Sequence, residues 1–215
     1  MTCVVTALPI RNLSEVEKVK RIDSDYVELR LDYLSELPSV EEFIEKVKEF
    51  KDRIIVTIRD VSEGGVNYVE EERKVRFYKA LFDEGFIYDV EARFLKKHEV
   101  PVEGKIVSLH YFESLPTFEE VKELFYPYAN RALLKLAVVG IGKYRQLLIR
   151  VLEEFPNVAV MPMKVNPVER IAYSILGSRL LYAHSGEETA QGQMYYKDAM
   201  RILSELGISC KKLTQ

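Results

Sequence analysis

The stretch that decides the fold runs from residue 25 to residue 59 and reads DYVELRLDYLSELPSVEEFIEKVKEFKDRIIVTIR. It begins and ends with short segments rich in apolar and β-branched residues, 25–31 and 53–59, which are typical of strands. Between them, Ser39 is followed three residues later by Glu42 and then by an apolar run. This capping-box pattern predicts that a helix begins at Ser39. The stretch is therefore predicted to form one strand–helix–strand unit.

The same alternation continues along the chain. Helix-like segments are expected from Thr117, which has Glu120 three residues on, and near 68–84, 143–155, 167–176 and 194–206. No hairpin signal such as Asn-Gly separates the strand-like segments, so we expect them to pair in parallel through crossover helices. These segments lie at 2–8, 25–31, 53–59, 86–91, 105–110, 131–138, 157–163 and 178–184.

Eight such units predict an α/β fold, a compact (β/α)8 barrel of the TIM type, formed as a single catalytic domain over residues 1–215. The fourth βα unit is expected to be abbreviated, because residues 92–104 leave little room for a full helix. An open doubly wound sheet is the competing architecture. Gly140 and Gly142 lack the rest of a GxGxxG pattern, so no phosphate-binding loop favours that alternative.

Composition and charge narrow the function classes. Hydrophobic residues make up 47% of the chain and charged residues 30%, with a formal net charge of -3, so we expect no nucleic-acid partner. No stretch approaches the roughly 20 apolar residues that span a bilayer, and no signal peptide is evident. Cys3 and Cys210 are the only cysteines, which favours a reducing cytoplasm without excluding one disulfide. No cluster has metal-ligand spacing, so no metal is expected.

Charged residues fall inside the predicted strands. In the segment 26–32, the two-residue period places Glu28, Arg30 and Asp32 on one face. An antiparallel edge strand could expose that face to water, whereas charges inside a parallel barrel are unfavourable unless they are paired or functional. Barrel enzymes gather catalytic groups at the carboxyl ends of their strands. Polar residues recur there in four further segments: Thr57 with Arg59, Asp89 with Glu91, Ser108 with His110, and Lys135.

Lys135 is the most specific single indication, because it lies in the middle of the apolar run 132–139. Desolvation disfavours an ammonium group, so a neutral amine able to attack a ketone is expected at this position. A buried lysine that only pairs with a carboxylate is the alternative. His110 taken alone is typical of a satisfied core histidine, but beside such a lysine it is a credible acid–base group.

Taken together, these segments resemble the type I 3-dehydroquinate dehydratases. Each short match is weakly specific, but six of them in the same order form a specific pattern. Two positions depart from the family pattern, since Tyr111 follows His110 and Thr189 replaces a serine. The matching strings are Glu28-Leu29-Arg30-Leu31-Asp32, Thr57-Ile58-Arg59 with Glu63-Gly64-Gly65, Ser108-Leu109-His110, Lys135-Leu136-Ala137, Arg170 ahead of Gly177-Ser178, and Thr189-Ala190-Gln191-Gly192-Gln193.

The resemblance implies a homodimeric hydro-lyase of the shikimate pathway of aromatic amino acid biosynthesis. This enzyme would convert 3-dehydroquinate to 3-dehydroshikimate without metal or organic cofactor. The resemblance also implies that Lys135 forms an imine with the substrate ketone, that His110 moves the proton and that Glu63 orients His110. It further implies that Arg170 binds the substrate carboxylate. The remaining substrate contacts would come from Glu28, Arg30, Arg59, Thr189, Gln193, Met163 and Tyr182.

The chemistry requires these residue types independently of the resemblance. An iminium is a better electron sink than a ketone, so it lowers the barrier to losing the neighbouring proton. One imidazole that removes this proton and then protonates the departing hydroxyl predicts a syn elimination. Two alternatives remain open: a class I aldolase, which uses the same imine to break a C–C bond, and a non-catalytic barrel that binds a polyol acid.

Overall fold

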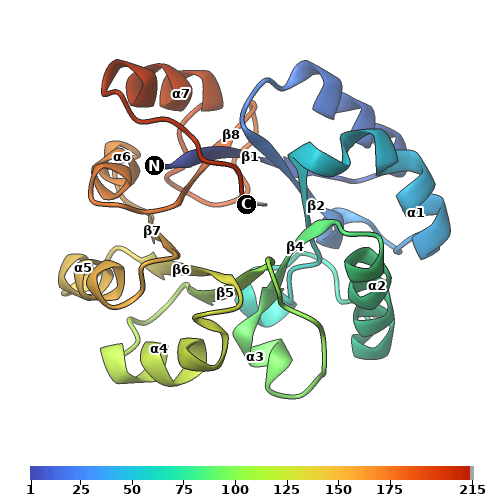
Figure 1. Ribbon diagram of the computed structural model, residues 1–215, viewed down its shortest axis with the longest axis horizontal. Helices are drawn as coiled ribbons and strands as arrows, with labels where there is room; N and C mark the ends of the chain where they lie inside the picture. Colours follow the sequence, from blue (N-terminus) through green and yellow to red (C-terminus); the bar gives the residue numbers. More distant parts are fainter. Residues whose placement is uncertain (214–215) are drawn as a thin grey trace.

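The computed structural model describes residues 1–213 and shows a central barrel of strands surrounded by helices (Figure 1). All eight strands are parallel, and hydrogen bonds join them in the order β7-β6-β5-β4-β3-β2-β1-β8. The TIM-type (β/α)8 barrel predicted from the sequence is therefore confirmed. The strands are β1 (Cys3–Pro9), β2 (Tyr26–Arg30), β3 (Ile54–Thr57), β4 (Ile87–Glu91), β5 (Ile106–Tyr111), β6 (Leu133–Val139), β7 (Val158–Met163) and β8 (Leu180–His184).

The barrel closes where β7 meets β8. The amide of Val160 in β7 donates to the Ser178 hydroxyl at 3.0 Å, and the Arg179 amide donates to the Val158 carbonyl at 3.0 Å. These bonds lie at the amino ends of the two strands, and no ladder continues along them in the described chain. The barrel is thus nearly closed, with its least-bonded seam between β7 and β8.

The helices follow the strands in the predicted alternation. Ser39 and Thr117 cap their helices as expected, since each hydroxyl accepts a hydrogen bond from the amide three residues on, at 3.1 and 3.2 Å. None of the described helices is long and apolar enough to cross a membrane. The α-helices are α1 (Val40–Val47), α2 (Glu71–Asp83), α3 (Ala92–Leu95), α4 (Phe118–Phe125), α5 (Tyr144–Glu154), α6 (Val168–Ile175) and α7 (Tyr196–Glu205).

Two connections depart from the regular unit. Helix α3 has only four residues, which confirms the abbreviated fourth unit. The first connection contains a 3-10 helix, η1 (Leu13–Arg21), in which Val16 and Val19 are buried. Their spacing of three residues matches the three-residue turn of a 3-10 helix. Shorter 3-10 segments are η2 (Leu31–Tyr33), η3 (Lys48–Arg53), η4 (Val61–Glu63) and η5 (Tyr126–Tyr128).

The two faces of the strands build two separate apolar regions. Outward-facing side chains pack against the helices in the larger core. Inward-facing side chains at the amino ends of the strands form a smaller apolar layer that fills this end of the barrel. This layer supports the polar residues above it, toward the carboxyl ends. Its members include Cys3, Tyr26, Ile87, Ile106, Leu133 and Leu180.

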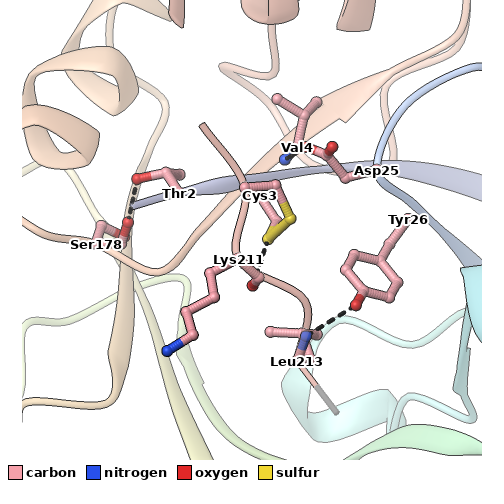
Figure 2. Close-up of a disulfide and its surroundings, with 9 residues drawn as sticks. Thr2, Cys3, Val4, Asp25, Tyr26, Ser178, Lys211 and Leu213 are labelled. Carbon is pink, nitrogen blue, oxygen red and sulfur yellow. Dashed lines mark hydrogen bonds between the residues drawn. A yellow bond between two sulfur atoms is a disulfide. The ribbon is translucent and has the colours of Figure 1, made fainter. Parts of the chain in front are cut away.

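A disulfide between Cys3 and Cys210 joins β1 to the segment after α7 (Figure 2). The sequence left this pairing open. The segment continues across the amino end of the barrel, where the Leu213 amide donates to the Tyr26 hydroxyl at 2.9 Å. In the described chain, the one group of His, Cys, Asp and Glu close enough to share a metal is Cys3, Asp25 and Cys210. Because the two sulfurs are bonded to each other, neither is available as a thiolate ligand.

Candidate active site

A cavity lies at the carboxyl ends of the strands, with about 460 Å³ of empty space of which part is open solvent. Every site residue predicted from the sequence lines it, so the structure brings together side chains that lie up to 165 positions apart. These residues are Glu28, Arg30, Arg59, Glu63, His110, Lys135, Met163, Arg170, Tyr182, Thr189 and Gln193.

Lys135 lies at the bottom of this cavity, on β6, with 4% of its surface exposed. Its Nζ atom is 2.8 Å from Asp89 Oδ2 and 3.6 Å from Glu28 Oε1. The ring of Tyr182 covers it from β8, with the ring centroid 3.9 Å from Nζ. The lysine is therefore paired with carboxylates, as the alternative from the sequence proposed, and it also faces the cavity.

Arg59 anchors the charged group beside Lys135. Its guanidinium contacts Asp89 Oδ1 at 2.9 Å, Glu91 Oε1 at 3.1 Å and the Ser108 hydroxyl at 2.7 Å. Burial alone would raise the pKa of Asp89, but the positive charges of Arg59 and Lys135 outweigh it and hold that pKa well below its usual range. Asp89 is therefore a permanent anion between two cations.

Lys74 extends this charged group through the wall of the barrel. It belongs to α2, yet its side chain is buried and its Nζ lies 2.7 Å from Glu91 Oε2. The other oxygen of Glu91 accepts from Arg59 and, at 2.9 Å, from the Asp60 amide. Glu91 therefore fixes both the side chain of Arg59 and the backbone that follows it. The sequence did not single out Lys74, because a lysine on an amphipathic helix usually faces water.

His110 is held at the end of β5 by Glu63. One oxygen of this carboxylate, Oε2, lies 3.0 Å from His110 Nδ1 and accepts from the His110 amide at 2.9 Å. This arrangement places the proton of a neutral ring on Nδ1 and leaves Nε2 free to accept a proton. Burial, together with the positive charges of Arg59 and Lys135, holds the pKa of His110 well below its usual value. The imidazole is thus neutral and available as a base near pH 7.

Glu63 reaches this position because of the glycines that follow it. Gly64 has φ of +86°, and a Cβ atom there would lie 2.4 Å from the Phe112 ring. A Cβ on Gly65 would lie 2.0 Å from the Arg59 carbonyl oxygen. Neither position accepts a side chain. The Glu-Gly-Gly string is therefore a tight turn that folds Glu63 back toward β5.

Arg170, on α6, is a buried cation with neutral partners. Its guanidinium donates to three backbone carbonyls, those of Pro162 at 3.2 Å, Tyr182 at 3.0 Å and Gln191 at 3.4 Å. Desolvation lowers the pKa of Arg170 to about 10, opposed by a weaker effect of Glu188. No carboxylate among residues 1–213 forms an ion pair with it. It is therefore suited to receive an anion at the rim of the cavity.

The loop between β8 and α7 covers one side of the cavity. Gln193 organises it, since its Oε1 accepts from the amides of Thr189 at 2.8 Å and Ala190 at 3.4 Å. Its Nε2 donates to the Thr189 hydroxyl at 3.2 Å. Gly192 adopts φ of +88° within this turn. The side-chain amide of Gln193 thus holds the loop in the described structure. The contact of Gln193 with a substrate remains a prediction.

Comparisons with known proteins identify the family of the chain. Residues 2–140 match the family model described as "Type I 3-dehydroquinase". The 3-dehydroquinate dehydratase of Sulfolobus acidocaldarius is 48% identical over 205 residues, covering 94% of this chain and 93% of the relative. That of Saccharolobus solfataricus is 38% identical over the same shares of both chains. These relatives extend past residue 140 and include the segment that carries Arg170 and Gln193.

Solved structures show the same fold at lower identity. The type I 3-dehydroquinate dehydratase of Clostridium difficile superposes with a TM-score of 0.77 at 22% identity, covering 95% of this chain and 92% of that one. The 3-dehydroquinate dehydratase of Geobacillus kaustophilus gives 0.74 at 23% identity, covering 96% and 91%. On the family model and the sequence relatives together, this chain belongs to the type I 3-dehydroquinase family.

Proposed function

We propose that this chain dehydrates 3-dehydroquinate to 3-dehydroshikimate through an imine on Lys135. The observation that carries the proposal is the joint placement of Lys135 and His110 on one cavity, with His110 held by Glu63 in the tautomer of a base. Family membership supports the reaction and the substrate. A polyhydroxylated carboxylate also fits the mixture of donors and acceptors around the cavity.

The proposed reaction begins when the amine of Lys135 adds to the C3 ketone and the ketone oxygen leaves as water. His110 Nε2 then removes a proton from C2, and the electron pair flows into the iminium to give an enamine. The C1–O bond breaks as the imidazolium returns this proton to the departing hydroxyl. Hydrolysis of the remaining iminium releases 3-dehydroshikimate and restores the amine. The net change is the loss of one water, without a cofactor.

Other side chains have supporting roles in the proposal. Arg170 binds the substrate carboxylate, because it is a buried cation whose present partners are neutral carbonyls. Asp89 and Glu28 lie against Lys135 and stabilise the positive charge of the iminium. Met163 and Tyr182 provide apolar walls for the ring. Glu28, Arg30, Arg59 and the Thr189–Gln193 loop face the ring hydroxyls.

The direct test is to trap the imine. The protein is incubated with 3-dehydroquinate and reduced with borohydride, and the modified peptide is located by mass spectrometry. Enone absorbance in an unreduced sample reports turnover. We expect a reduced adduct on Lys135 together with enone formation. An adduct on another lysine, or enone formation without any adduct, would contradict the proposed imine.

We further propose that residues 1–215 act as one catalytic domain in a cytoplasmic homodimer. The resemblance to the family supports the dimer, and sedimentation velocity at assay concentration tests it. The Cys3–Cys210 disulfide does not oppose a cytoplasmic location, because intracellular proteins of hyperthermophiles also contain disulfides. A purely monomeric species with full activity would remove the homodimer from the proposal.

A further inference from the structure

We propose that Arg93 is a positioning residue for this reaction, because it clamps the Glu63 carboxylate in the place from which that carboxylate fixes the His110 ring. Arg93 lies in the first turn of α3, just after β4. The inference rests on the proposed role of His110 as the base. It adds a residue that neither the sequence pattern nor the substrate cavity identifies, since Arg93 does not line that cavity.

The contacts divide Glu63 between two partners. Arg93 Nη1 donates to Glu63 Oε1 at 2.8 Å, while Oε2 serves the ring and the amide of His110. The same Nη1 lies 3.5 Å from the His110 carbonyl oxygen. If the Glu63 carboxylate rotates, it therefore loses either its ion pair with Arg93 or its hydrogen bonds with His110. Arg93 acts on His110 through this carboxylate.

Arg93 is itself held from the outer side. Its guanidinium carbon lies 4.4 Å from the centroid of the Tyr111 ring, a favourable cation–π geometry. The Tyr111 hydroxyl donates to Glu120 Oε1 at 2.7 Å, and Arg93 Nη2 is 4.0 Å from the same oxygen. The short α3 places Arg93 within reach of both β5 and α4. Tyr111, where the chain departs from the family pattern, thus forms the rear support of Arg93.

The charges around Glu63 explain why this clamp matters. Burial and the neighbouring Glu91 raise the pKa of Glu63 to about 7, while Arg59 and Arg93 oppose that rise. Arg59 is already engaged with Asp89 and Glu91. Arg93 is therefore the cation hydrogen-bonded to Glu63 itself. Without Arg93, Glu63 is protonated over a wider pH range. A protonated Glu63 no longer provides the carboxylate that accepts a hydrogen bond from His110 Nδ1.

The experiment compares Arg93→Met with Arg93→Lys, which keeps the charge. For Arg93→Met we expect kcat to fall about 10- to 100-fold, less than the roughly 10²–10⁴-fold that a positioned acid–base group itself supplies, with KM within about twofold. The acid limb of its kcat/KM profile should move up by about one pH unit, the size of a lost charge contact. Arg93→Lys should recover most of kcat and the original limb. Borohydride should still trap the imine on Lys135 in both variants, which shows that the site is folded.

Matched controls separate positioning from general support of the structure. Tyr111→Phe removes only the hydroxyl contact with Glu120 and keeps the ring beside Arg93, and Glu120→Gln removes a charge 4.0 Å from Arg93. Both leave the contact between Arg93 and Glu63 in place, so each should keep kcat within about twofold. Equal losses in these variants, or no recovery in Arg93→Lys, would overturn the inference. So would an Arg93→Met enzyme with normal kcat and an unmoved acid limb. If His110→Ala itself keeps normal turnover, the proposed catalytic role of His110 fails first, and the Arg93 inference fails with it.

Discussion

The two ends of the barrel are built from the same eight strands, yet their interiors are opposite in character. At the amino end the inward residues are apolar, and a disulfide ties β1 to the segment that crosses this end (Figure 2). Toward the carboxyl end the same faces carry Glu28, Arg59, Asp89 and Lys135, all buried. On this difference we assign stability to the apolar amino end and the proposed chemistry to the charged carboxyl end. Each of the following changes should therefore affect one property far more than the other.

The largest effect on activity is expected from Lys135→Met. Without the amine no imine forms, and the expected loss in kcat is at least about 10⁴-fold, typical of removing a covalent nucleophile. Asp89 keeps its contact with Arg59, so the thermal transition should change far less than the activity, although the buried group loses one positive charge. Turnover, borohydride trapping and melting are measured together. The control is Lys164→Met, an exposed lysine after β7 whose loss should leave turnover unchanged; a large loss there would reverse the assignment.

Arg170→Met should weaken substrate binding strongly and leave the fold intact. A hydrogen-bonded ion pair with the substrate carboxylate contributes about 2–3 kcal/mol, so KM should rise about 30- to 150-fold. Stability should not fall greatly, because the variant also removes a buried cation whose partners are neutral carbonyls. Steady-state kinetics and melting give both values. The exposed Arg145, paired with Glu169 at 2.9 Å, provides a matched Arg145→Met control with unchanged KM.

The pH dependence of kcat/KM should follow the protonation of Glu63. Burial raises its pKa to about 7, so the carboxylate that holds His110 is protonated as pH falls through that value. Below about pH 7 we expect kcat/KM to fall about tenfold per pH unit. The pKa of His110 lies well below its usual value, so the imidazole stays neutral through this limb. Glu63→Gln should be slow and should lack the limb. A limb that persists unchanged in that variant must come from another group.

The smallest effect on activity, and the clearest effect on stability, is expected at the amino end. Cys210→Ser removes a crosslink between residues 207 positions apart. The expected loss is about 2–4 kcal/mol of unfolding free energy, or about 5–15 °C in Tm for a chain of this size. Turnover at 25 °C should stay within about twofold, because the apolar layer separates the disulfide from the cavity. A comparable loss of activity would show that the two ends are not independent.

Much of this division could be predicted from the sequence. The two-residue alternation placed Glu28 and Arg30 on one face, and the barrel rule assigned that face to the interior. The capping hydroxyls of Ser39 and Thr117 fixed two helix starts correctly. These features are local, so each can be identified within a few residues. The cavity residues on the strands followed because parallel strands bring their carboxyl ends together. The other cavity residues, such as Glu63, Arg170 and Gln193, were expected only from the resemblance to the family.

The features that escaped prediction depend on long-range contacts. Lys74 looks like a solvated helical lysine until α2 is packed against β4 and its amine meets Glu91. Arg93 acquires its role only because the short α3 brings it beside the Glu63 turn. The disulfide joins the two extremes of the chain, and two cysteines in a sequence do not reveal whether they meet. None of these contacts has a periodic signature.

The buried charged group at the carboxyl end favours a positive charge on the nitrogen of Lys135. Its buried ion pairs contain four cations and four anions, of which Arg30 and Asp32 form a pair of their own, so the charges balance only while the nitrogen of Lys135 is positive. In the proposed reaction the neutral attacking amine would leave one negative charge in excess, and the iminium would restore the balance. For this proposed reaction the barrel is therefore a counterion matched to the covalent intermediate, and it is in place before substrate binds. The members are Arg30, Arg59, Lys74 and Lys135 with Glu28, Asp32, Asp89 and Glu91.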